Sequence, residues 1–525
     1  MPVTDDLPPR LRAALLGGGY TIDGVRDRLG PMAGAALARE EIVPALPCTA
    51  GDDPLSVALR LWWLQVPVDA SAVRATYPDG LTDALLTAGL LTFCGDQLRA
   101  NVRIRPWDAD PPGALAAGAA PASGTALAPG TAAAPGGGRG YIVSDLAARP
   151  GDAPPAADHV VGAGGASDSL ARLVHRAPVE RALDLGTGCG VQALHLSGRA
   201  GRVHATDVNQ RALDLAHLTF ALSEVTNVET RLGSLFEPVR EDRFDLIVSN
   251  PPFVIGPAGR YTYRESGLPG DEVCRALVAR APGHLAPDGW CHLLGNWLHV
   301  RGEDWRDRVG GWLTGTGCDG WAVQRDVQDP AEYVELWLRD SVEAGTPRYR
   351  ELYDTWLDWF TRNEVDGIGF GWLTMHAAGT LDPVVRVEEL THPVTEPAGA
   401  YVTGVLAGIA DAYRLGDADL LSAALRIAPG VTQEYHGPPG FTDPEKIVLR
   451  QAGGLRRARQ VDTVTAALAG VCDGTMPVDP LLAAIAELTG EPADELRARA
   501  PEVLRSLIAE GYFVPPSLEE AVHAG

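Results

Sequence analysis

Four consecutive residues, Asn250-Pro251-Pro252-Phe253, combine hydrogen-bond acceptors with an aromatic ring. The paired prolines hold the backbone extended and remove two N–H donors, so the carbonyl groups face outward uncontested. The Asn250 side-chain oxygen and the Pro251 carbonyl could together accept both hydrogens of a planar NH₂ group, and Phe253 could stack on its plane. Accepting both hydrogens would return electron density to the nitrogen and orient its lone pair toward an electrophile. The reaction would then depend on the alignment of the reacting atoms more than on a strong general base. We therefore predict that Asn250, Pro251, Pro252 and Phe253 are catalytic.

A glycine-rich run, Asp184-Leu-Gly-Thr-Gly-Cys-Gly190, is the second chemical feature. Glycines let the chain pass close to a ligand, and Asp207 further along could accept two hydrogen bonds from a ribose diol. The GxGxG spacing differs from the GxGxxG of dinucleotide sites. Asp184 would repel a pyrophosphate but attract the cationic amino-acid end of S-adenosylmethionine. These residues therefore predict S-adenosylmethionine as the cofactor.

Alternating strands and helices must position these two loops. The apolar patterns predict one helix that follows the glycine-rich run and ends at Ser197, and two more over Gln210–Glu224 and Asp271–Ala281. They predict strands over Val179–Leu185, Val203–Asp207, Val228–Leu232, Phe244–Val248, Trp290–Leu294, Trp321–Val327 and, last, Ile368–Met375. Such alternation indicates a doubly wound α/β fold with a mostly parallel sheet. Ligands bind such sheets at the carboxyl ends of the strands, where both loops fall.

Residues 141–300 resemble the class I S-adenosylmethionine-dependent N-methyltransferases that carry an NPPY or NPPF motif. This group includes the HemK-like glutamine methyltransferases and the RNA or DNA amino-group methyltransferases. The resemblance rests on four motifs: Asp184–Gly190, Asp207, Leu235-Phe236-Glu237-Pro238 and Asn250–Phe253. It implies a Rossmann-like domain in which Asp207 holds the ribose, the glycine loop holds the methionine part, and Asn250 with Pro251 holds the acceptor nitrogen.

The resemblance also implies a full set of cofactor-binding residues: Asp184, Gly186, Thr187, Gly188, Gly190, Asp207, Val208, Asn209, Ser234, Leu235 and Asn250. HemK-like enzymes usually have an acid at the position of Ser234, and a serine accepts a hydrogen bond from the adenine amino group more weakly. Phe253 in place of tyrosine also resembles the guanine-modifying ribosomal RNA methyltransferases. The residues from His159 to Ser167 correspond to the lead-in segment over the cofactor.

The rest of the chain divides around this domain. We predict a helical, winged-helix-like domain over 1–106, a disordered Ala/Pro/Gly linker over 107–140, the methyltransferase domain over 141–395 with a helical insertion at 346–366, and a second winged-helix-like domain over 396–525. The N-terminal prediction rests on helices followed by a hairpin of Gly89–Phe93 and Leu98–Ile104. Such modules in enzymes more often dimerise or hold substrate than bind DNA.

Three further groups of residues could serve the acceptor side. The loop after the catalytic tetrapeptide contains Tyr261, Tyr263, Arg264 and Glu265, which we predict to contact substrate. The insertion has an aromatic stripe, predicted first as ordinary packing and alternatively as a lid that excludes water: Tyr349, Tyr353, Trp356 and Phe360. The densest basic cluster suggests a solvated helix face or a patch for an acidic partner: Arg450, Arg456, Arg457 and Arg459.

Composition narrows the function classes. The 525 residues carry a net charge of −24, which argues against bulk electrostatic coating of nucleic acid. Seven scattered cysteines without a CxxC pair, no apolar membrane-spanning run and no signal-peptide pattern indicate a soluble cytoplasmic protein without a membrane partner. The histidines form no metal-ligand group, so we expect no metal.

The predicted acceptor is a glutamine side-chain amide in a protein or peptide, favoured by the Leu235–Pro238 phrase and the negative charge. Three alternatives stay open. They are an adenine or guanine amino group in RNA, a small natural-product amine, and a non-catalytic nucleic-acid-binding regulator. An intact Asn250–Phe253 motif disfavours the last, because a regulator has no need to hold an acceptor nitrogen.

Overall fold

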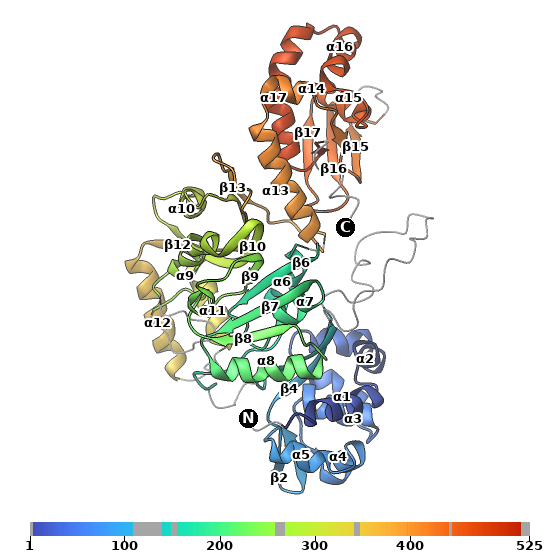
Figure 1. Ribbon diagram of the computed structural model, residues 1–525, viewed down its shortest axis with the longest axis vertical. Helices are drawn as coiled ribbons and strands as arrows, with labels where there is room; N and C mark the ends of the chain where they lie inside the picture. The colour runs from blue at the N-terminus through green and yellow to red at the C-terminus, as the bar shows by residue number, and fades with distance from the viewer. Residues whose placement is uncertain are drawn as a thin grey trace.

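A single eight-stranded sheet occupies the middle of the computed structural model (Figure 1). The structure describes residues 4–108, 139–148, 155–175, 177–257, 268–340, 347–395, 397–439 and 444–515. The strand order is β13-β11-β12-β10-β9-β6-β7-β8, with β12 antiparallel to both neighbours and all other pairs parallel. The strands are β6 Val179–Leu185, β7 Ala200–Asp207, β8 Val228–Leu232, β9 Phe244–Ser249, β10 Leu285–Val300, β11 Asp319–Gln328, β12 Val365–His376 and β13 Val385–Glu389. The predicted α/β class is confirmed.

Helices cover both faces of this sheet and bury its apolar side chains. They are α6 Gly165–Leu173, α7 Val191–Ser197, α8 Gln210–Leu222, α9 Glu272–Arg280, α10 Trp305–Leu313, α11 Pro330–Asp340 and α12 Pro347–Arg362. Along β9, Leu246 and Val248 join the core on the α7 and α8 side, whereas Ile247 joins the core with α9 and α10. A strand buried on both faces has no alternating pattern, which explains the continuous apolar run of β9.

Two strands differ from the sequence prediction. β10 extends over 16 residues and pairs with β12 along most of its length. Its pattern is interrupted by His292, Gly295 and Asn296, although the histidine and the asparagine are buried. β13 was not predicted, because Val385–Glu389 contains only two apolar residues. Polar residues at sheet positions therefore remove the apolar period by which a strand is predicted in both segments.

The N-terminal region contains helices followed by a small sheet. It comprises α1 Leu7–Gly17, α2 Ile22–Leu37, η1 Val43–Ala45, η2 Pro47–Thr49, α3 Pro54–Ala58, the π turn η3 Leu59–Trp63, β1 Val68–Asp69, α4 Ala70–Thr76, α5 Leu81–Thr87, β2 Leu91–Cys94 and β3 Gln97–Ala100. β2 and β3 pair as an antiparallel hairpin, and β1 adds a third strand beside β3. The hairpin was predicted at this place; the winged-helix designation stays a prediction.

A strand pair joins the N-terminal region to the central domain. β4 (Arg103–Asp108) pairs with β5 (Arg139–Ser144) in antiparallel register, from Arg103 opposite Ser144 to Asp108 opposite Arg139. Residues 107, 108, 139 and 140 are therefore strand residues and do not belong to the predicted linker, and Ile104 lies in β4 instead of the hairpin. Residues 109–138 lie outside the described part of the chain. Side chains of both regions share one hydrophobic core, so the N-terminal region packs directly on the central domain.

The C-terminal region, drawn in orange and red in Figure 1, begins with the long helix α13. Its elements are α13 Gly399–Arg414, α14 Asp417–Ser422, β14 Arg426–Ile427, β15 Val431–His436, β16 Lys446–Gln451, β17 Ala458–Val461, α15 Thr463–Val471, α16 Val478–Thr489, α17 Ala493–Ala509 and β18 Phe513–Val514. The three-stranded sheet β15-β16-β17 precedes the helices, and β18 pairs with β14. The described residues of this region thus lack the hairpin after the helices that a winged helix requires.

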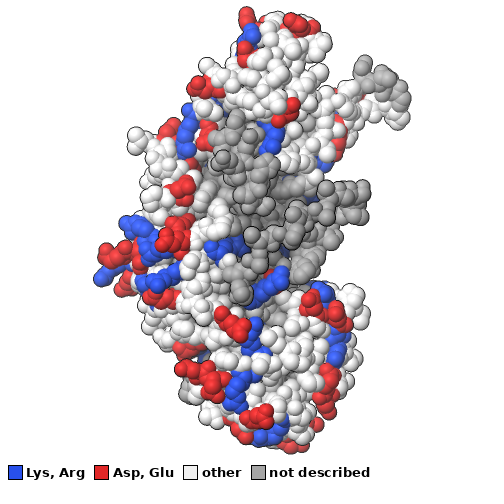
Figure 2. Space-filling model, turned by 45° about the vertical axis from the view of Figure 1, so that its right-hand side comes forward, with Lys and Arg blue, Asp and Glu red and all other residues white. Residues whose placement is uncertain are grey.

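The arginine cluster of this region does not lie on a helix. Arg450 and Arg459 belong to β16 and β17, and the other two lie next to the turn between them. Arg450 pairs with Glu434 at 2.6 Å, Arg457 with Glu388 at 2.7 Å, and Arg459 with Glu510 at 2.8 Å. Three of the four charges are therefore balanced within the chain. On the face shown in Figure 2, acidic and basic side chains are interspersed.

Candidate functional site

The glycine loop follows β6 and has a backbone shape that only glycine adopts easily. Gly186, Gly188 and Gly190 have φ values of 75°, 53° and 89°. A Cβ atom at Gly186 or Gly188 would meet nothing within 4 Å, whereas one at Gly190 would lie 2.8 Å from the Phe220 ring. The first two glycines thus border open space, and the third lets α7 pack closely on α8.

Asp184, near the end of β6, stabilises the glycine loop through two hydrogen bonds. Its Oδ2 accepts hydrogen bonds from Thr187 Oγ1 at 2.6 Å and from the Ala193 N–H at 2.9 Å. Burial raises the pKa of Asp184 to about 7, and the nearby Asp207 charge adds to this effect. Oδ1 is buried and has no hydrogen-bond partner among the described residues. Asp184 therefore shapes the loop, a role the sequence did not reveal, and keeps one oxygen for a further donor.

Asp207 ends β7 directly beside the glycine loop. Oδ2 accepts from the Gly188 N–H and Oδ1 from the Asn209 N–H, both at 2.9 Å. Its backbone carbonyl accepts from the Gly233 N–H at 2.9 Å, which ties it to the loop after β8. Burial raises the pKa of this half-buried carboxyl. Asp207 thus lies where the loops after three neighbouring strands meet.

The other predicted cofactor residues surround Asp207. Val208 is exposed, and Asn209 caps α8 by accepting from the Arg211 N–H at 3.0 Å. Asn209 also donates from Nδ2 to the Asp158 carbonyl at 2.8 Å, which brings the lead-in segment close to the loop. Ser234 is exposed after β8.

The Leu235–Pro238 phrase has a packing role in the fold. Leu235 has a φ of 49° and packs against the core that contains Phe236. The Phe236 ring is buried and stacks on His284 with centroids 4.4 Å apart. These contacts anchor the loop after β8, so that Ser234 is presented at the same edge as Asp207.

The tetrapeptide Asn250–Phe253, predicted to be catalytic, follows β9 at the same edge. Ser249 Oγ donates to the Leu185 carbonyl at 2.7 Å, which joins the ends of β9 and β6. Asn250 is half-buried and donates from Nδ2 to Ser167 Oγ at 3.4 Å, beneath the lead-in helix α6. Pro251 is buried and Phe253 half-buried. The fold therefore brings together the glycine loop, Asp207 and the tetrapeptide, as the strand pattern predicted.

The residues after the tetrapeptide are held by helices α11 and α12. The Ile255 N–H donates to the Tyr333 hydroxyl of α11 at 2.8 Å. A Cβ atom at Gly256 would lie 3.0 Å from the Trp356 ring of α12. The predicted aromatic stripe packs in this cluster, with Trp356 and Phe360 buried and Tyr349 and Tyr353 partly buried. Tyr333 was missed because its partner lies 78 residues away in sequence.

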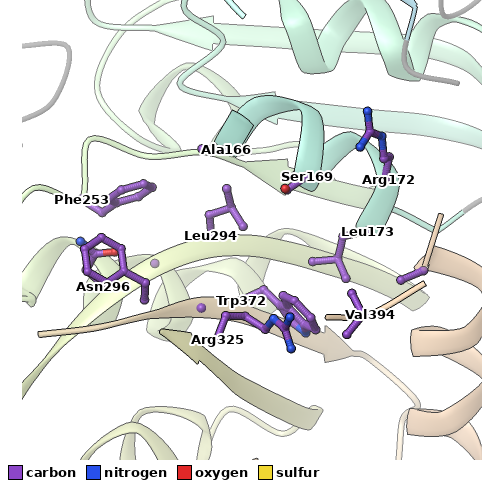
Figure 3. A pocket seen from close by; sticks show the side chains of 14 residues that line it. Ala166, Ser169, Arg172, Leu173, Phe253, Leu294, Asn296, Arg325, Trp372 and Val394 are labelled. Carbon is purple, nitrogen blue, oxygen red and sulfur yellow. The ribbon is translucent and has the colours of Figure 1, made fainter. Parts of the chain in front are cut away.

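A cavity of about 280 Å³ opens beside Phe253 (Figure 3). It lies between α6 and strands β10 and β12, and its wall continues into the start of α13. Its lining is mainly apolar and includes Leu173, Phe253, Leu294, Asn296, Trp372 and Val394. Asn296, the polar residue in the middle of β10, was the available sequence signal for this wall. The predicted substrate residues Tyr261, Tyr263, Arg264 and Glu265 lie outside the described residues.

Two other properties of the described residues concern ligands and membranes. None of their side chains form a group of three or more His, Cys, Asp or Glu suited to a metal ion. In this same part of the chain, no helix combines the length and apolar character needed to cross a bilayer.

Comparison with known proteins matches two segments. Residues 164–297 match the methyltransferase small domain family, and residues 18–101 match a domain of unknown function (DUF7059). The release factor glutamine methyltransferase of Xylella fastidiosa (strain Temecula1) is 37% identical over 141 residues, covering 25% of this chain and 51% of that protein. The ribosomal protein uL3 glutamine methyltransferase of Bradyrhizobium diazoefficiens is 33% identical over 141 residues, covering 24% and 44%.

The chain spans about half the length of these two relatives. A solved methyltransferase from Pyrococcus furiosus is 18% identical, covers 38% of this chain and 76% of its own, and has a TM-score of 0.24. The fold assignment therefore rests on the sheet order described above. The central part of the chain is a class I, S-adenosylmethionine-dependent methyltransferase domain, similar in sequence to the HemK-like glutamine N-methyltransferases.

Proposed function

We propose that this protein transfers the methyl group of S-adenosylmethionine to the side-chain amide nitrogen of a glutamine in a polypeptide. The observation that carries the proposal is the position of Asn250 and Pro251 at the end of β9, beside the glycine loop and Asp207. The glutamine methyltransferase names of the two relatives support the choice of acceptor.

The residues around the glycine loop fit the cofactor. The open space at Gly186 and Gly188 would leave room for its methionine part, and Asp184 Oδ1, which has no partner among the described residues, could accept a hydrogen bond from an ammonium group. Asp207 would hold the ribose, since each carboxylate oxygen has a second lone pair beyond its backbone bond. Val208 and Ser234 lie exposed beside it for the adenine. When bound, the cofactor supplies the electrophilic methyl group.

The acceptor side depends on hydrogen-bond acceptors more than on a base. Asn250 Oδ1 and the Pro251 carbonyl would each take one hydrogen of the amide NH₂, while Phe253 stacks on the amide plane. This arrangement directs the nitrogen lone pair toward the methyl group and counters its delocalisation into the carbonyl. The new N–C bond forms as the S–C bond breaks, and the nitrogen then releases one proton to water.

The charge distribution favours a polypeptide over RNA. Three of the four arginines in the densest basic cluster already pair with Glu434, Glu388 and Glu510. Phosphate binding needs several unpaired cationic side chains on one surface. On the face shown in Figure 2, charges of both signs alternate instead of forming a basic field.

The test is transfer of a labelled methyl group from S-adenosylmethionine into fractionated lysate. We expect a product that is sensitive to protease and resistant to ribonuclease, with the label on glutamine after hydrolysis by enzymes. Ribonuclease-sensitive label would favour a nucleobase acceptor, and label in small molecules a free amine. No label in any fraction would contradict the enzymatic proposal.

Asn250→Ala serves as the active-site variant in this assay. We expect turnover to fall by about 100-fold or more, because one of two acceptors for the NH₂ hydrogens is lost. Cofactor affinity, measured by calorimetry, should change little. Intact turnover with normal cofactor binding would show that Asn250 does not hold the acceptor.

A further inference from the structure

Asn296 is a buried polar residue in the wall of the cavity next to the tetrapeptide. Asn296 is only 1% exposed, yet it lines the cavity near Phe253 (Figure 3). Because Ser249 pairs with Leu293 in parallel register, Asn250 is level with Leu294. Asn296 points to the same side as Leu294, about 7 Å further along β10. One amide group could thus span from Asn250 to Asn296.

Tyr333 fixes the orientation of this carboxamide. Asn296 Nδ2 donates to the Tyr333 hydroxyl at 3.2 Å, and the Ile255 N–H donates to the same oxygen at 2.8 Å. Tyr333 is fully buried among aromatic side chains, including Phe360 and Phe370, and burial raises its pKa. The Tyr333 hydroxyl of α11 therefore holds both the segment after the tetrapeptide and Asn296 in the cavity wall.

The Asn296 carboxamide still has unused hydrogen-bonding capacity. A carboxamide offers two N–H groups and an accepting oxygen. Among the described residues, Tyr333 is its one side-chain hydrogen-bond partner, so the second N–H and Oδ1 are left for a ligand. Buried polar groups are normally satisfied, and Asn296 lines a cavity together with the apolar side chains of Leu173, Leu294 and Trp372. The missing partner is therefore expected to enter with the acceptor.

We propose that Asn296 binds the carbonyl oxygen of the amide whose nitrogen is methylated, and that Tyr333 is its positioning residue. This inference rests on the proposed glutamine acceptor. A hydrogen bond to the carbonyl oxygen draws the nitrogen lone pair toward oxygen, so it does not accelerate transfer. Its contribution is to bind the amide and fix its plane, and it discriminates an amide from an amine that has no carbonyl group.

The experiment measures KM and kcat for the acceptor polypeptide recovered by labelled methyl transfer from lysate. Asn296→Ala should raise KM about tenfold, the loss expected for one hydrogen bond, with kcat within about twofold of wild type. Asn296→Asp should raise KM at least as much, because a carboxylate cannot donate to a carbonyl. Tyr333→Phe keeps the buried ring and its packing, and should raise KM in the same direction.

Asn227→Ala is the matched control. Asn227 donates from Nδ2 to the Ser197 and Ala200 carbonyls at 3.0 and 2.8 Å, away from the cavity, so its loss should leave KM unchanged. Cofactor affinity and thermal unfolding are measured for every variant. If Asn296→Ala destabilises the fold, the more conservative Tyr333→Phe carries the test.

Three results would overturn the inference. If wild type methylates a polypeptide amide but Asn296→Ala and Tyr333→Phe keep its KM, the proposed function stands and the role of Asn296 is wrong. If Asn296→Ala lowers kcat, raises KM and destabilises the fold to a similar extent, Asn296 has a structural role only. If wild type labels no polypeptide, both proposals fail together.

Discussion

Replacing Asp184 by asparagine should stabilise the cofactor-free protein at neutral and alkaline pH. Burial raises the pKa of this carboxyl from 3.8 to about 7, so the folded protein resists its ionisation. Each pKa unit corresponds to about 1.36 kcal/mol, and the ionised form therefore costs the fold about 4 kcal/mol. Asparagine keeps an oxygen for Thr187 Oγ1 and the Ala193 N–H without carrying the charge.

The sign of the pH dependence follows from the raised pKa. Below about pH 4 Asp184 is protonated in both the folded and the unfolded chain and contributes no difference. Between about pH 4 and 7 the unfolded chain ionises while the folded chain keeps its proton, so wild-type stability falls as pH rises. Above pH 7 the loss is complete. The stability difference between variant and wild type should therefore grow from near zero to about 4 kcal/mol across this window.

Urea unfolding of both proteins at half-unit steps from pH 4.5 to 8 measures this difference. A stability difference that stays constant across the range, or that shrinks as pH rises, would refute the argument. Addition of S-adenosylmethionine supplies a second check. A bound ammonium group favours the ionised carboxylate, so wild type should bind the cofactor more tightly as pH rises through 7, and Asp184→Asn should show no such trend.

Two further pairs of variants test the glycine loop and a buried ion pair. Gly188→Ala should lose cofactor affinity, because its φ of 53° costs a side chain about 1 kcal/mol and its Cβ occupies the open loop, whereas Gly190→Ala should mainly lower the melting temperature, because its Cβ would lie 2.8 Å from Phe220. Calorimetry that finds normal cofactor binding by Gly188→Ala would contradict this. Arg414→Ala should cost about 3–5 kcal/mol in chemical unfolding, because it leaves the Asp319 carboxylate, 0% exposed, without its partner at 2.6 Å. The double variant with Asp319→Asn should recover part of this loss, and a loss below about 1 kcal/mol would show that α13 does not depend on the pair.

The parts of the site that sequence reasoning predicted are those encoded by neighbouring residues. The glycine loop, Asp207 and Asn250–Phe253 each follow an apolar strand, and the ends of parallel strands meet at one edge. Tyr333 and Asn296 were missed, because their contact joins residues 37 positions apart on different elements. No local spacing encodes such a contact.

The arginine cluster shows a different cause of error. Its basic residues were interpreted as a helix face, but they lie on and beside the β16–β17 turn. Gly453-Gly454 lies between them, and Gly454 has a φ of 58°, which is typical of a turn. The helix-face prediction rested on the density of basic residues and did not take this glycine turn signal into account. The strand β10 was predicted only in part, because buried His292 and Asn296 interrupt its apolar pattern.

The pairing of β4 with β5 has a consequence for how this protein can change during evolution. Asp108 and Arg139 lie opposite each other, so the chain between them begins and ends at the same place on the molecule. The entropy of closing such a loop grows only with the logarithm of its length, by about 0.6 kcal/mol for each doubling. Insertions and deletions there are therefore nearly neutral for folding. The strand pair and the shared core hold the N-terminal region on the central domain, so a change in the length of the Ala/Pro/Gly segment should leave the placement of both regions unchanged.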